Sequence, residues 1–244
     1  MKISILLPYK ENFSYDKAGA VSLYVKDISA NSFFKNDISI YGDTISKNKL
    51  LKNFIHLDTG RKFYLSKTNA YIDEFIKYEQ KQNSDIIEIH NRPSYLKQIK
   101  KFTNSKIIIY FHNDPLSMKG SKTISERLEI LKNTKKIIFI SEWVKSRFFS
   151  NIDSKLSTNT EVIYHSVNKQ LPVKKNKFIT YVGKLNHAKG YDIYSEAIVK
   201  ILDEFPKWKA LSIGDEERRS IYINHKNHNE LGYLNHKKTL DIFN

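Results

Sequence analysis

The chain has 244 residues, with 41 lysine and arginine side chains against 26 aspartate and glutamate side chains, and it has no cysteine. The lack of cysteine excludes disulfide bonds and thiolate metal sites and fits a reducing compartment. The N-terminal apolar run is too short for a signal peptide, and no apolar stretch approaches the roughly 20 residues that span a bilayer, so we expect a cytoplasmic protein.

The first part of the chain alternates short apolar runs with amphipathic stretches, which is the pattern of an α/β domain. The predicted strands are residues 2–7, 37–41, 53–57, 85–90, 106–111, 136–140 and 161–164. One helix is predicted to begin near residue 20, and two others are predicted at residues 64–82 and 125–132. The runs 85–90 and 106–111 are nearly continuous in apolar residues, which is typical of parallel strands that are covered on both faces.

The remaining residues predict a second, smaller α/β domain. The polar segment 169–177, which contains Pro172, is the expected linker. Beyond it, the predicted strands are 178–182, 208–213 and 229–232, and the predicted helices are 191–205 and 237–243. The expected organisation is a Rossmann-like domain at residues 1–168 and an incomplete Rossmann-like domain at residues 178–244.

Polar and flexible residues follow several of the predicted strands. Gly19 lies between the first strand and its helix, where a missing side chain lets a ligand approach the helix N-terminus. His90 and Arg92 follow one central strand, and His112 and Asn113 follow the next. Open parallel sheets bind their ligands at this edge. The structural alternatives are a glycine that serves only the turn and a histidine that is bonded only to the backbone.

The segment 178–190, FITYVGKLNHAKG, predicts an anion site in the second domain. A short apolar strand ends on Gly183, the following loop carries Lys184 and Lys189, and Gly190 opens an amphipathic helix. Two cations and a helix N-terminus are therefore expected to converge at the carboxyl end of a strand, which suits a diphosphate. The alternative is a solvated loop, because a lysine-rich chain produces such runs by chance.

In their order and spacing, these motifs resemble those of the retaining GT-B glycosyltransferases of family GT4. GKLNHAKG is similar to that family's GR-L-x-x-x-KG signature, with Lys184 in place of the arginine. YFHNDP resembles the turn that ends a central strand of its first domain. VIYHSVN resembles its V-I-x-N-G-V-D turn, with His165 and Ser166 in place of Asn and Gly. The turns after Ile213 and Leu231 resemble its I-V-G-x-G and L-G segments.

The resemblance implies an enzyme that transfers a sugar from a nucleotide-sugar donor to a saccharide or lipid-linked acceptor, with retention and without a metal or other cofactor. It implies His112 as the catalytic residue beside the donor sugar. The other implied contacts are Lys184, Lys189 and Gly19 for the donor diphosphate, Gly214 and Gly232 for the donor base and ribose, and His90, Arg92 and Asn113 for the acceptor. Such enzymes serve bacterial polysaccharide or lipopolysaccharide biosynthesis, and the positive charge suits peripheral contact with an anionic inner membrane face.

Two other interpretations stay open. The resemblance is expected to cover about the first two thirds of a full-length enzyme, without the E-x7-E region that would hold the donor sugar, so the chain is alternatively a non-catalytic nucleotide-binding fragment. The net charge of +15 alternatively indicates a nucleic-acid-binding protein, although neither a nucleic-acid-binding motif nor a concentrated basic block supports this. A lysine-rich composition spread along the whole chain explains the charge equally well.

Overall fold

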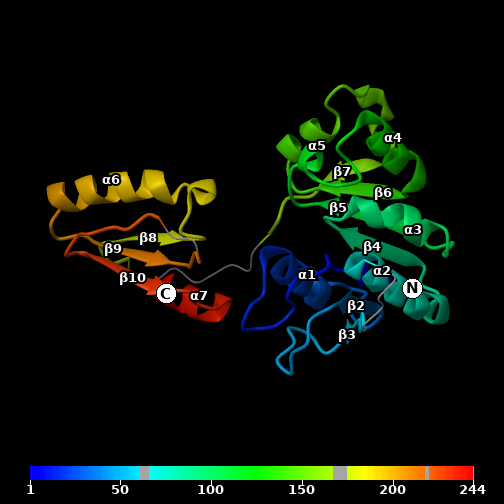
Figure 1. The fold of residues 1–244 in the computed structure, drawn as a ribbon, viewed down its shortest axis with the longest axis horizontal. Helices are drawn as coiled ribbons and strands as arrows, with labels where there is room; N and C mark the ends of the chain where they lie inside the picture. The colour runs from blue at the N-terminus through cyan, green and yellow to red at the C-terminus, as the bar shows by residue number, and fades with distance from the viewer. Residues whose placement is uncertain (61–65, 167–174, 218–219, 244) are drawn as a thin grey trace. The chain divides into compact units, whose positions relative to one another are not determined.

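The structure, a computed structural model, describes residues 1–60, 66–166, 175–217 and 220–243. The chain divides into two compact units, which we call unit 1 (residues 1–167) and unit 2 (residues 168–244) (Figure 1). The predicted domain boundary at residue 168 and most of the predicted linker at 169–177 lie outside the described residues.

Unit 1 is built on a seven-stranded sheet in which every neighbouring pair is parallel. Its order is β3-β2-β1-β4-β5-β6-β7, so the strand order reverses direction between β1 and β4. The strands are β1 (Ile3–Leu6), β2 (Ile38–Gly42), β3 (Phe54–His56), β4 (Ile86–His90), β5 (Lys106–Phe111), β6 (Lys136–Phe139) and β7 (Thr160–Val162). This is the order of a doubly wound sheet, and the predicted α/β class is confirmed.

Helices cover both faces of this sheet. They are α1 (Ala20–Asn31), α2 (Lys67–Gln82), α3 (Leu96–Lys100), α4 (Ile124–Asn133) and α5 (Glu142–Phe148). Side chains of α2, α3, α4 and α5 share one buried apolar cluster with β4, β5 and β6, whereas Val25 of α1 belongs to a second cluster with β1 and β2. Side-chain caps begin two of these helices: Thr123 and Glu126 form a capping box at α4, and Ser141 accepts from the Val144 amide at α5.

Unit 2 has a three-stranded parallel sheet in the order β10-β9-β8, made of β8 (Phe178–Val182), β9 (Lys209–Ile213) and β10 (His228–Gly232). Two helices, α6 (Tyr191–Glu204) and α7 (His236–Phe243), accompany it. Ile198 and Leu202 of α6 form a small buried cluster with Ala210 of β9. The order repeats the β3-β2-β1 half of unit 1, so the predicted incomplete Rossmann-like arrangement is what the described residues form.

The predicted boundaries agree with the observed ones to within a few residues. The sequence did not predict the five-residue helix α3, which follows Pro93. The predicted helix at 64–82 is observed from Lys67 onward, because Ser66 is its N-cap, with an extended backbone and a side chain that accepts from the Asn69 amide. Residues 64 and 65 of the predicted range lie outside the described residues. Among the described residues, none of the helices has the length and apolarity needed to cross a membrane.

Candidate functional site

Three histidines from separate strands of unit 1 form a hydrogen-bonded row. His90 ends β4, His112 follows β5, and His165 follows β7. Nδ1 of His90 lies 2.9 Å from Nε2 of His112, and Nδ1 of His112 lies 3.1 Å from Nε2 of His165. The sheet brings these residues together because the carboxyl ends of its parallel strands share one edge.

The row leads from the interior of unit 1 to its surface. His90 is fully buried, His112 is 7% exposed, and His165 is exposed. Tyr110 stacks on His90 with ring centroids 4.5 Å apart, and Tyr24 of α1 stacks on His165 with centroids 4.3 Å apart. These aromatic contacts fix the planes of the inner and outer imidazoles.

A carboxyl group faces the inner end of the row. Oε2 of Glu88 lies 3.6 Å from Nε2 of His90, and neither buried atom has a hydrogen-bond partner among the described residues. Burial raises the pKa of Glu88 to about 7. Burial, with a smaller contribution from His165, lowers the pKa of His90 to about 3. Burial and the neighbouring histidines lower the pKa of His112 to about 2, so both inner imidazoles are neutral near pH 7.

The hydrogen bonds of the row limit which ring nitrogens of His90 and His112, the two histidines predicted as site residues, can reach a ligand. His90 was predicted to contact an acceptor; it is fully buried, its Nδ1 is bonded to His112, and the acceptor contact remains a prediction. Both ring nitrogens of His112 are engaged, so its ring could bond to a sugar only by releasing a neighbour. The exposed member of the row is instead His165, whose Nδ1 makes no hydrogen bond to a described residue.

Arg92 and Asn113, the other predicted acceptor contacts, flank the row on the loops behind β4 and β5. Arg92 is half-buried and donates from Nη1 to the carbonyl of Asn91 at 2.8 Å. Asn91 has a left-handed backbone, with φ of 57°, and its Oδ1 accepts from the amide of His112 at 3.1 Å. Asn113 is exposed. The predicted acceptor contacts of Arg92 and Asn113 remain predictions.

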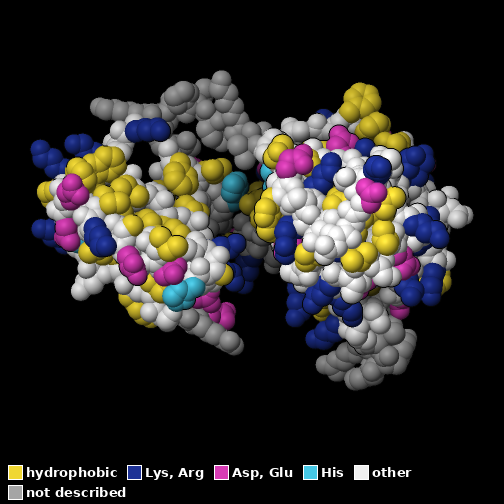
Figure 2. All heavy atoms as spheres, turned by 90° about the horizontal axis from the view of Figure 1, so that it is seen from above, with side chains coloured by type: hydrophobic (Ala, Val, Ile, Leu, Met, Phe, Trp, Pro, Cys, Tyr) yellow, Lys and Arg dark blue, Asp and Glu magenta, His cyan; other side chains and the backbone are white. Residues whose placement is uncertain are grey.

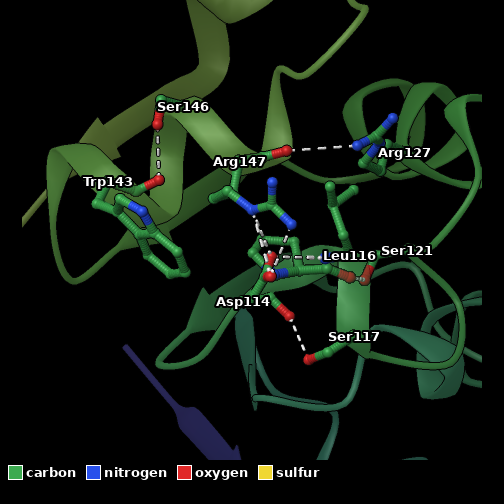
Figure 3. A network of polar contacts seen from close by, with 9 residues as sticks. Asp114, Leu116, Ser117, Ser121, Arg127, Trp143, Ser146 and Arg147 are labelled. Atoms are coloured by element: carbon green, nitrogen blue, oxygen red, sulfur yellow. Dashed lines mark hydrogen bonds and ion pairs between the residues drawn. The ribbon is translucent and has the colours of Figure 1, made fainter.

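The loop that carries His112 is anchored by an ion pair to α5. Asp114 accepts from Nη2 of Arg147 at 3.0 Å and from Nε of the same guanidinium at 3.2 Å (Figure 3). This hydrogen bonding lowers the pKa of the Asp114 carboxyl. The buried Arg127 donates to the carbonyls of Arg147 and Ser150 at the end of α5. The Asp of the H-N-D turn therefore has a structural role.

Gly19, a predicted diphosphate contact, lies at the N-cap of α1 with an extended backbone. Oε1 of Glu11 accepts from the amide of Ser22 at 3.1 Å, and a Cβ built on Gly19 would lie 2.5 Å from that oxygen. The glycine thus makes room for a carboxylate of the same chain. An incoming anion would compete with Glu11 for this helix N-terminus, and the predicted diphosphate contact remains a prediction.

In unit 2, three glycines line the carboxyl edge of the sheet at the ends of neighbouring strands. The amide of Gly183 donates to the carbonyl of Ile213 at 3.0 Å, and the amide of Gly214 donates to the carbonyl of Gly232 at 2.9 Å. A Cβ on Gly214 would lie only 1.8 Å from the carbonyl oxygen of Gly183. The structure therefore brings Gly214 and Gly232 next to the loop that begins at Gly183.

The lysine loop is closed by one tyrosine hydroxyl. Oη of Tyr181 donates to the carbonyl of Lys184 at 2.9 Å and lies 3.1 Å from that of Lys189. Both lysines are exposed, and neither ammonium pairs with another residue of the described ranges. At the start of α6, Asp192 already accepts from Nδ1 of His187 at 3.0 Å. The loop therefore offers two unpaired cations, whereas the helix N-terminus carries its own carboxylate.

Basic side chains are also found elsewhere on the molecule. On the face shown in Figure 2, lysine and arginine side chains form several separate groups between hydrophobic and acidic ones. In unit 1, a pocket of about 510 Å³ between α3 and α4 has several lysines on its lining, together with Glu126 and Glu129. No cluster of three or more His, Asp or Glu side chains within the described residues could hold a metal ion.

The sequence reasoning missed His165, the outer member of the row, and Glu88, which faces its inner end. Glu88 was treated as an ordinary strand residue, although a carboxylate in an apolar strand two positions before His90 must share a face with it. His165 was noted only as a departure from the family turn, and no role was assigned to it. Glu88 faces its near neighbour His90, but the hydrogen bonds that connect His90 to His112 and His112 to His165 join residues 22 and 53 positions apart.

No protein-family model matches the chain. The structure of Anabaena HepE in complex with UDP-glucose superposes with a TM-score of 0.70 at 14% identity, over 96% of this chain and 70% of HepE. Such a match defines the class of the fold, which is the GT-B fold of glycosyltransferases, and the predicted fold resemblance is confirmed.

Two proteins of Bacillus subtilis strain 168 are similar in sequence. YtcC, whose name describes a glycosyltransferase, is 22% identical over 230 residues that cover 84% of this chain and 54% of YtcC. Spore coat protein SA is 20% identical over 241 residues that cover 88% of this chain and 61% of that protein. The chain thus spans little more than half the length of these relatives.

Proposed function

We propose that the chain binds a nucleotide-sugar donor and acts in the transfer of its sugar to a saccharide or lipid-linked acceptor, with retention and without a metal ion. The observation that carries this proposal is the lysine loop of unit 2, residues 183–190, in a GT-B fold. The exposed Lys184 and Lys189, whose ammonium groups pair with no other described residue, belong to the loop that follows β8, at the carboxyl edge where Gly183, Gly214 and Gly232 end neighbouring strands. This arrangement suits a diphosphate with its attached nucleoside.

In this proposal the lysines neutralise the diphosphate as it leaves the sugar. Charge that develops on a leaving group is stabilised by cations already in place, which is the electrostatic part of catalysis. Lysine provides charge without the planar fork of arginine, so we expect each ammonium to contact single phosphate oxygens. Gly214 and Gly232 border the same edge, and we propose that the nucleoside lies along them.

UDP-glucose is the first donor to test, because HepE was crystallised with it. The acceptor side is proposed to be the edge of unit 1 where His112, His165, Arg92 and Asn113 gather. Contact with an anionic membrane face follows from the charge of +15 and from the lipid-linked class of acceptor. Oligonucleotide binding with a steep salt dependence would instead favour a nucleic-acid partner.

Calorimetric titration with UDP, GDP, ADP and UDP-glucose tests the proposed site. We expect saturable binding of at least one diphosphate, and a combined Lys184→Ala and Lys189→Ala variant should bind it about 30- to 100-fold more weakly. At about 1–1.4 kcal/mol for each hydrogen bond, the two together contribute roughly 2–2.7 kcal/mol, which corresponds to that loss.

The matched control changes Lys200 and Lys207 to alanine. Both are exposed lysines of unit 2 away from the loop, so the net charge falls equally while the proposed contacts stay. Equal weakening in the two double variants would mean that only overall charge attracts the nucleotide. Binding without release of nucleoside diphosphate from any sugar donor would favour the alternative of a non-catalytic nucleotide-binding protein.

A further inference from the structure

The histidine row of unit 1 has a property that its individual members lack. Each imidazole in it is bonded to the next through opposite ring nitrogens, so a proton that moves across one bond can be followed by a proton across the next. The inner end faces a carboxyl group and the outer end faces solvent. We propose that Glu88, His90, His112 and His165 form a proton relay, which exchanges one proton between Nδ1 of His165 and Oε2 of Glu88.

The relay has two states with the same heavy-atom arrangement. When Glu88 is ionised, Nε2–H of His90 points to the carboxylate, Nε2–H of His112 points to His90, and Nε2–H of His165 points to His112. When a proton binds Nδ1 of His165, the three Nε2 protons each move one position inward. The last of them bonds to Oε2 of Glu88, each imidazole ends neutral with its proton on Nδ1, and no electron is transferred.

The one long link lies between Glu88 and His90. Their 3.6 Å separation exceeds a hydrogen bond by about 0.6 Å, and proton passage requires the two atoms to approach by that amount. Both atoms are buried and neither is held by another described partner, so no other described residue competes for them. A hydrogen bond between an unsatisfied buried donor and an unsatisfied buried acceptor lowers the free energy of the folded chain, which favours the approach of these two atoms.

The surroundings favour a neutral row that accepts one proton at its inner end. Tyr24 of α1 and Tyr110 of β5 face Glu88, and burial raises the pKa of Tyr24 to about 12 and that of Tyr110 further, so both keep their protons. Glu161 of β7 also faces Tyr110, but it pairs with Lys136 at 2.9 Å. Glu88, with its pKa near 7, is the member that changes charge close to neutral pH.

The relay would place a base, Nδ1 of His165, at the surface of unit 1. Glu88 would hold the proton in the interior. A hydroxyl that lies against Nδ1 of His165 could lose its proton to the row, and Glu88 would end protonated. If the proposed glycosyl transfer holds, the hydroxyl in question belongs to the acceptor, and this use of the relay rests on that function. His165 would then be the catalytic residue, and Glu88 and His90 would act through it as positioning residues.

Nitrogen-detected NMR of the histidine rings tests the relay in the whole chain, without any substrate. We expect His90 and His112 to carry their protons on Nδ1 at pH 5.5 and on Nε2 at pH 8.5, with one shared midpoint near pH 7. The relay is overturned if either ring keeps one tautomer across this range in the folded protein.

Two test variants and one control variant make the test specific. Glu88→Gln should abolish the tautomer change, whereas Glu129→Gln, at an exposed position on α4, should leave it intact. A change that persists in Glu88→Gln would refute the role of Glu88.

His165→Gln tests the outer end of the relay. The substitution alters only the exposed end, so the fold is expected to stay. Exchange between the two tautomeric states should slow enough to give separate signals. Unchanged fast exchange in that variant would refute the proposed path, whatever nucleotides the chain binds.

Discussion

The Gly214→Ala variant is expected to lose the fold of unit 2 while unit 1 stays intact. The added Cβ would lie 1.8 Å from the carbonyl oxygen of Gly183, and hydrogen bonds between strand ends hold the backbone of both glycines in place. Relief requires β8 and β9 to separate at their carboxyl ends. Because such overpacking in a rigid site costs about 3 kcal/mol or more, the small core around Ile198 and Leu202 should not withstand it.

Amide hydrogen exchange, read residue by residue, measures this effect in both units at once. Protection in β8 and β9 should fall to that of an unfolded chain, whereas protection in β4 and β5 should stay unchanged. Gly232→Ala is the matched control, because Gly232 lies on the same sheet edge with φ of 67° and has open space around its Cβ position. We expect only the left-handed backbone cost there, about 1 kcal/mol. Equal loss of protection in the two variants would contradict the close contact.

The free energy of unfolding should respond to Glu88 in a pH-dependent way. The carboxyl has a pKa of about 7 in the folded chain and an ordinary value of 4.5, so the folded state holds a proton that the unfolded state releases. Stability therefore falls as the pH rises from about 4.5 to 7, by about 3 kcal/mol in total. Glu88→Gln removes this loss, because the amide stays neutral at every pH.

Urea unfolding of both proteins at pH 4.5 and pH 8 isolates this contribution. We expect the Glu88→Gln variant to equal the parent chain at pH 4.5 and to exceed it by about 3 kcal/mol at pH 8. The pKa of His90 and that of His112 are lowered, so these rings destabilise the fold as the pH falls below 6.5, but they do so in both proteins. The Glu129→Gln control should differ by less than about 0.5 kcal/mol at either pH. A difference that does not change with pH would contradict a buried, neutral Glu88.

Much of the fold could be predicted from local patterns. The runs KIIIYF and KIIFI are apolar over the length of a strand, and the observed β5 and β6 lie within a residue of them. Turn residues and caps such as Ser141 mark helix starts by short-range chemistry. The helix α3 was missed because only tertiary contacts, through Leu96 and Ile99, stabilise a segment of five residues.

The candidate site was predictable only in part. The placement of His112 and the lysine loop at strand ends followed from the sheet itself. By contrast, the tyrosine that closes the lysine loop and the Glu11 carboxylate at α1 depend on contacts of side chains with backbone groups 3 to 11 positions away, which the strand and helix patterns do not show. The same holds for Glu88 and His165, whose roles appear only once strands from different parts of the sequence are adjacent. A one-dimensional pattern carries no information about such pairings.

The most direct test of the proposed function is to map UDP on the chain by amide NMR. The account predicts that added UDP shifts the amides of residues 183–190, 214 and 232 together and to saturation, and leaves the amides of α3 and α4 unchanged. Saturable shifts confined to the lysine-lined pocket between α3 and α4, or no saturable shift in a folded chain, would contradict a donor diphosphate site in unit 2.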